Sequence, residues 1–140
     1  MHCLDISAYQ ELVSLHYLVG NLERCVFYAE EVIMLDPTNH SHYSRLGELL
    51  YGCKEYERAA QAYAHSLRLN SDEHNARAAY GLWVVGAEIA KTQRKGSSPT
   101  VGDTSETSGK HLRQWAVERL RRMYAGRATA AILEMMLQTS

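Results

Sequence analysis

With 140 residues, 46% of them hydrophobic and 22% charged, the chain is long enough for one domain with a modest core. Two prolines and one phenylalanine, beside abundant Ala, Leu, Glu and Arg, favour helix over sheet. The net charge is −1, and the sequence lacks both the roughly 20 apolar residues of a membrane span and the basic start and apolar core of a signal peptide.

Residues 1–73 repeat with a period of 34 residues. An apolar helical run stops at Asp36-Pro37, and a second run restarts after a short polar turn. A period of 34 with two helices in each unit is typical of tetratricopeptide repeats, so we predict two full repeats over residues 1–73. The pairs that a shift of 34 superimposes include Tyr9 with Tyr43, Leu12 with Leu46, Tyr17 with Tyr51, Ile33 with Leu67 and Leu35 with Leu69.

Small residues mark the predicted helix crossings. We expect Gly47 to leave room where the two helices of the second unit nearly touch, and Cys25 and Ala59 to be small for the same reason. Pro37 cannot continue a helix and moves the preceding residue out of the α region, so it closes one unit and opens the next.

A third unit starts after residue 73 and is interrupted. Residues 74–90 predict its first helix, residues 91–110 predict a flexible loop rich in Ser, Thr, Gly and Lys, and residues 111–140 predict a basic amphipathic helix followed by a capping helix. The predicted fold class is therefore all-α: a tetratricopeptide-repeat α-solenoid with two full repeats, a split third repeat and a C-terminal capping helix. We also expect the chain to be the end of a longer solenoid, because about three units are needed for a stable stack.

The residues offer little for metal binding or catalysis. His40 and His42 lie in a repeat turn, but a zinc site needs three or four convergent ligands, and Cys25 and Cys53 occupy packing positions. Cys3, Cys25 and Cys53 form no CxxC pair, so we expect reduced thiols. The sequence contains no GxSxG, no phosphate-binding Gly-rich loop and no HExxH. We therefore expect neither an enzyme nor a bound metal or cofactor.

The concave side of the predicted solenoid is the candidate binding surface. Tyr17 and Tyr51 offer flat amphipathic surface to a protein partner, although the same spacing also fits packing between repeats, and both interpretations stay open. The positions considered carry no Lys, Asn or Arg, and Glu48 would repel an acidic tail, so a carboxylate clamp for a chaperone tail is not expected. The candidate protein-binding residues are Gln10, Ser14, Tyr17, Ser44, Glu48 and Tyr51, together with Ser7, Leu18, Ser41 and Gly52.

Positive charge gathers near the C-terminal end. Residues 1–90 carry six Lys or Arg against twelve Asp or Glu, hence −6, whereas residues 91–140 carry nine against four, hence +5. This basic surface could contact anionic lipid, bind RNA, pair with an acidic protein, or simply be a solvated helix; RNA binding lacks support, because aromatic residues other than Trp115 do not alternate with the basic ones. The residues concerned are Arg113, Arg119, Arg121, Arg122 and Arg127.

Several short segments, in order, resemble one tetratricopeptide family. They include Tyr9-x-Glu11-Leu12, Glu30-Glu31 before an apolar run, Pro37-x-Asn39-His40, Tyr80-Gly81-Leu82 and Tyr124-Ala125-Gly126-Arg127. On these segments the chain resembles the C-terminal half of the family of subunit 2 of the endoplasmic reticulum membrane protein complex.

The resemblance implies a function. It implies a non-catalytic scaffold on the cytoplasmic face of the endoplasmic reticulum membrane, peripheral to it, which holds cytosolic parts of membrane-embedded subunits and a soluble cytosolic subunit. The assembled complex would insert tail-anchored and multipass membrane proteins. The alternative is a tetratricopeptide adaptor for another soluble protein assembly. Neither hypothesis includes nucleic acid as a partner.

Overall fold

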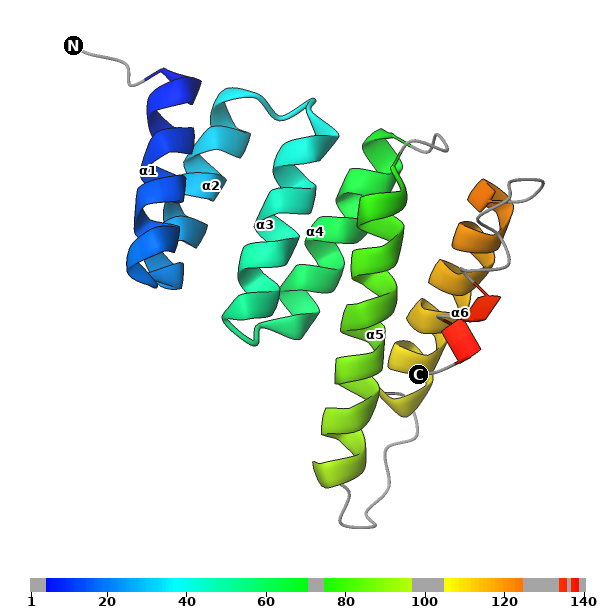
Figure 1. Ribbon diagram of the computed structural model, residues 1–140. Coiled ribbons are helices and arrows are strands. Elements are labelled where there is room, and N and C mark those ends of the chain that lie inside the picture. Colours follow the sequence, from blue (N-terminus) through cyan, green and yellow to red (C-terminus); the bar gives the residue numbers. More distant parts are fainter. Residues whose placement is uncertain (1–4, 71–74, 97–104, 125–133, 136, 139–140) are drawn as a thin grey trace.

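The computed structural model describes residues 5–70, 75–96, 105–124, 134–135 and 137–138. The described residues form α-helices joined by turns and contain no strand, which confirms the predicted all-α class. Figure 1 shows the helices following one another as antiparallel neighbours. The six long helices are α1 (Ile6–Val19), α2 (Leu22–Leu35), α3 (His40–Gly52), α4 (Tyr56–Leu69), α5 (Ala76–Gly96) and α6 (Ser105–Tyr124).

The helix ends follow from a few residues in the turns. Gly20 ends α1 with φ of 80°, a left-handed conformation in which a Cβ is strained. The side chains of Asn21 and Asn39 accept hydrogen bonds from the backbone N–H groups of Arg24 and Ser41, and thereby cap α2 and α3. Helix α2 ends before Asp36-Pro37, as the sequence predicts.

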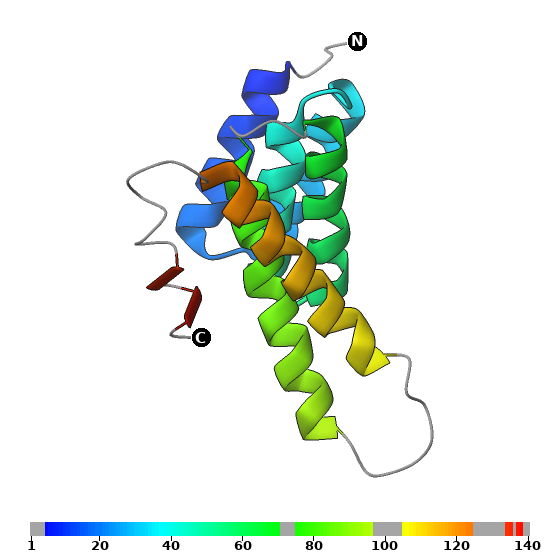
Figure 2. The same cartoon turned by 90° about the vertical axis from the view of Figure 1, so that its right-hand side faces the viewer.

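The helices pack as three successive pairs. Helix α1 packs on α2, α3 on α4 and α5 on α6, while α2 and α4 also contact the first helix of the next pair. Figures 1 and 2 show α6 crossing the long α5 at the end of this row. Cys25 and Ala59 are fully buried, in agreement with their predicted place at helix crossings. Burial raises the pKa of the Cys25 thiol, which donates a hydrogen bond to the Val13 carbonyl oxygen at 3.3 Å.

Glycines make room for one aromatic ring between α3, α4 and α5. A Cβ on Gly47 would lie 2.8 Å from two ring carbons of Tyr63, and a Cβ on Gly81 would come closer still. The ring of Tyr63 is therefore held between two helices that lack side chains at these points, and burial raises the pKa of its hydroxyl. This confirms the room predicted at Gly47.

A buried polar network links α3 to α4. The Ser66 hydroxyl donates to the His40 carbonyl oxygen at 2.8 Å and lies 2.8 Å from the Ser44 hydroxyl oxygen. The Asn75 amide nitrogen donates to the Ser66 hydroxyl oxygen at 3.2 Å and to the Asn70 carbonyl oxygen at 3.1 Å. Each hydroxyl thus has a partner, as buried polar groups require. The network joins α3, α4 and the residue that precedes α5.

The predicted loop over residues 91–110 was too long. Helix α5 continues to Gly96, and α6 already begins at Ser105, so helix covers both ends of that range. Lys91 and Thr92 extend α5 because both bond back to Glu88, through an ion pair at 2.9 Å and through a hydroxyl bond to the carbonyl oxygen. Residues 97–104 lie outside the described part of the chain. So do Gly126, Ala128, Ala131, Ile132 and Met136, on which the predicted capping helix mainly depends.

Candidate protein-binding groove

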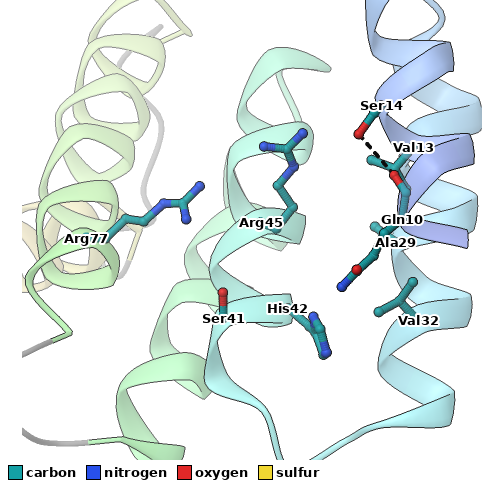
Figure 3. A pocket seen from close by; sticks show the side chains of 9 residues that line it. All are labelled: Gln10, Val13, Ser14, Ala29, Val32, Ser41, His42, Arg45 and Arg77. Carbon is teal, nitrogen blue, oxygen red and sulfur yellow. Dashed lines mark hydrogen bonds between the residues drawn. The ribbon is translucent and has the colours of Figure 1, made fainter. Parts of the chain in front are cut away.

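A groove of about 300 Å³ lies between α1, α2, α3 and the start of α5. Its apolar base belongs to the first helix pair, while its polar walls come from three helices (Figure 3). The base consists of Val13, Ala29 and Val32, and the walls consist of Gln10, Ser14, Ser41, His42, Arg45 and Arg77.

The turn between α2 and α3 fixes one end of the groove. His42 lies 3.3 Å from Asp36, through its Nε2 atom and a carboxylate oxygen. The Thr38 hydroxyl donates to the other carboxylate oxygen of Asp36 at 3.0 Å. These contacts lower the pKa of the Asp36 carboxyl, chiefly through the Thr38 hydroxyl. The ring of His42 is thereby held against the turn, where it forms one wall.

Arg45 is the principal cation of the groove. It belongs to α3, and its guanidinium lies 5.8 Å from the centre of the Tyr17 ring on α1, within cation–π range. Among the described residues, no carboxylate forms an ion pair with Arg45. Figure 3 shows its side chain between Arg77 on one side and Ser14 and Gln10 on the other.

Arg77 reaches the groove from α5 already paired. It forms a bidentate ion pair with Glu48 of α3, with Nη2 and Oε2 2.6 Å apart. This hydrogen bonding raises the pKa of the Arg77 guanidinium. The Glu48 carboxylate is therefore already paired with a residue from a different helix, and the expected repulsion of an acidic segment did not take this partner into account.

The predicted groove residues separate into two groups. Gln10, Ser14 and Ser41 line the groove, and Tyr17 borders it with 56% of its surface exposed. Ser44 was predicted wrongly: it is 2% exposed, because Ser66 bonds to it from α4.

Tyr51 and Gly52 face neighbouring helices instead. The half-buried ring of Tyr51 lies 5.6 Å from the ring of Tyr56, and burial raises the pKa of its hydroxyl. A Cβ on Gly52 would meet the Leu22 side chain of α2 at 3.2 Å. For Tyr51 the structure thus supports packing between helices, one of the two interpretations left open, whereas Tyr17 stays accessible.

The sequence-based prediction of groove residues did not include two arginines, Arg45 and Arg77. Arg45 follows Ser41 by four residues, so it lies on the same helical face, and this spacing was a usable signal. Arg77 gave no such signal, since its approach depends on how α5 packs beside α3.

The arginines of the basic surface that the structure describes each contact an aromatic ring or a carboxylate. Arg113 and Arg119 lie over the rings of Trp83 and Trp115, at 5.5 and 5.7 Å from the ring centres. Arg127 lies outside the described residues. The two remaining arginines form ion pairs at 2.7 Å, Arg121 with Glu134 and Arg122 with Glu118.

The described part of the chain also bears on metal binding and membrane crossing. There, no group of three or more His, Cys, Asp or Glu side chains is placed to hold a metal ion. His40 contacts the Asn70 amide through Nε2 at 3.0 Å, and His42 contacts Asp36, so the two histidines have separate partners. Within the same residues, no helix is both long and apolar enough to cross a membrane.

The relatives that the chain matches share one name. No protein-family model matches the chain. In an alignment of 128 positions that covers 88% of this chain, it is 28% identical to ER membrane protein complex subunit 2 of Xenopus tropicalis and to subunit 2-A of Xenopus laevis. Over the same length it is 27% identical to subunit 2-B of Xenopus laevis. The chain spans about 40% of the length of these relatives, so it resembles part of ER membrane protein complex subunit 2.

Proposed function

We propose that the chain is a non-catalytic scaffold subunit of an endoplasmic reticulum membrane protein complex. The observation that carries this proposal is the similarity to subunit 2 of that complex over 88% of the chain. In this proposal the helix pairs are tetratricopeptide units of an α-solenoid. The groove between α1, α2, α3 and the start of α5 holds a cytosolic segment of another subunit, either membrane-embedded or soluble.

The proposal includes a location and a task. The chain sits on the cytoplasmic face of the endoplasmic reticulum membrane and is held there by its partners, without a catalytic site of its own. The assembled complex supports insertion of tail-anchored and multipass membrane proteins. The names of the relatives support the membership in the complex, and the accessible groove supports the scaffold role.

Affinity purification tests the proposal. A tagged chain is expressed in its own cells, membranes are solubilised in mild detergent, and the proteins that co-purify are identified by mass spectrometry. We expect other subunits of the complex, and we expect the chain to leave the membrane fraction when those subunits are depleted. Recovery of a soluble assembly without any of them would instead favour a tetratricopeptide adaptor of a different assembly.

A further inference from the structure

The groove has the chemistry of an anion-binding site above an apolar floor. Its nine lining residues include Arg45, Arg77 and His42 but no carboxylate. Two acidic groups bound to lining residues are already engaged, Glu48 with Arg77 and Asp36 with His42. The positive charge of Arg45 is therefore balanced by no carboxylate among the described residues.

The neighbours of Arg45 are suited to an incoming carboxylate. The Tyr17 ring lies beside the guanidinium, which restricts the arginine side chain before any ligand arrives. Ser41 and Gln10 supply polar groups on the groove walls. The Ser14 hydroxyl donates to the Gln10 carbonyl oxygen at 3.0 Å, so its proton is already used within α1. Arg45 is thus the strongest available donor for an anion at this place.

The groove also favours one kind of chain over others. Val13, Ala29 and Val32 form an apolar base beneath the polar walls, which suits an apolar side chain next to an acidic one. A single guanidinium without a carboxylate partner matches one carboxylate, whereas the two carboxylates of an acidic chain end need more donors.

We propose that this groove binds an internal Glu or Asp of an extended segment of a partner protein, with Arg45 as the anchoring residue and the neighbouring apolar side chain on Val13, Ala29 and Val32. This inference rests on the proposed function in one respect: it names the chemistry of the segment that the scaffold holds.

The test uses the full chain and three labelled peptides. The first alternates Leu and Glu and has both ends capped; the second replaces each Glu by Gln; the third is the Gln peptide with a free C-terminal carboxylate. Binding is measured by fluorescence anisotropy at low and high salt. We expect the Glu peptide to bind about tenfold more tightly than either Gln peptide, and salt to reduce that preference.

Variants then assign the preference to Arg45. Arg45→Gln should remove it and Arg45→Lys should keep part of it. Arg24→Gln, the control, should leave it unchanged, because Arg24 is exposed on α2 outside the groove. Ser41→Glu places a carboxylate in the groove at the first turn of α3, where a negative charge favours the helix. It should therefore weaken Glu-peptide binding without loss of circular dichroism signal, even if Arg45→Gln fails to fold.

Several results would overturn the inference. Equal losses in Arg45→Gln and Arg24→Gln would mean general charge attraction, and a preference for the free C-terminus would mean recognition of a chain end. Arg45-dependent binding of phosphatidylserine vesicles, without a preference for Glu over Gln, would assign the groove to a lipid headgroup. Co-purification of the complex with Arg45→Gln as with the unmodified chain would sink this inference but keep the proposed function. A preference for the Glu peptide, with no subunit of the complex co-purifying, would keep this inference but contradict the proposed function.

Discussion

The first two helix pairs place different side chains at equivalent positions. A shift of 34 residues superimposes α1–α2 on α3–α4. It also superimposes four residues that line the groove on four residues of the second pair, where the equivalent space is filled. In the second pair, the Tyr63 ring and the Ser44–Ser66 contact fill the space that is open in the first. The superimposed pairs are Gln10 with Ser44, Val13 with Gly47, Ala29 with Tyr63 and Val32 with Ser66.

This difference shows what a repeat determines and what it leaves to individual residues. The register fixes where each side chain starts, but the size of one ring decides whether a groove exists. Ala29 is too small to fill the space that Tyr63 fills in the second pair. On the facing helix the sizes are the other way round, because the first pair has Val13 where the second has Gly47. The same register also gives unequal exposure between helices: Leu15 is 59% exposed, whereas Leu49 and Trp83 are 2% and 7% exposed.

The largest expected effect tests this inequality of exposure. Leu49→Ala should lower the free energy of unfolding by about 2–5 kcal/mol, because it empties a closely packed place in the core. Leu15→Ala, the matched change one repeat earlier, should change it by no more than about 0.5 kcal/mol. Urea unfolding followed by circular dichroism measures both. Similar losses would mean that another part of the chain covers α1.

The second prediction concerns the glycines of α3. Gly47→Ala should destabilise by about 1–3 kcal/mol, since its methyl group would overlap the Tyr63 ring. Gly52→Ala is the control in the same helix: its methyl group would meet the end of the Leu22 side chain at 3.2 Å, and alanine is the better helix former. We expect Gly52→Ala to be nearly neutral in the same unfolding experiment. A neutral Gly47→Ala would show that the ring can move aside.

The third prediction uses the exposed face of α1. Leu15 is 59% exposed and Leu18 and Val19 are each 82% exposed, whereas Leu12 is half-buried, so Leu18 is the better site for a substitution. Leu18→Glu should reduce self-association of the isolated chain and leave its helicity unchanged, because the side chain is already in water. Sedimentation velocity over a range of concentrations measures this. A monomeric parent chain would contradict it.

Much of the fold could be predicted from the sequence, but only part of the groove. Helix ends depend on local residues such as Gly20, Asn39 and Pro37, and these are readable in one dimension. The exposure of Ser44 cannot be predicted in this way. It depends on Ser66, which bonds to Asn75, and Asn75 directly precedes the first helix of another pair.

The smallest expected effect concerns the turn at the end of the groove. The pKa of Asp36 is lowered in the folded chain, chiefly by the Thr38 hydroxyl, so the carboxylate form favours folding. Such a contribution is present above the unfolded pKa of about 3.9 and is lost as the pH falls through the folded pKa. Thr38→Ala should therefore lower the urea midpoint at pH 7 and lower it less at pH 3. In an Asp36→Asn background the effect of Thr38→Ala should be the same at both pH values, since no carboxylate remains there to titrate. Other carboxylates titrate equally in each matched pair and cancel in the difference. If Thr38→Ala costs the same at pH 7 and pH 3 in the parent chain, the hydroxyl acts on the geometry of the turn and not on the charge of Asp36.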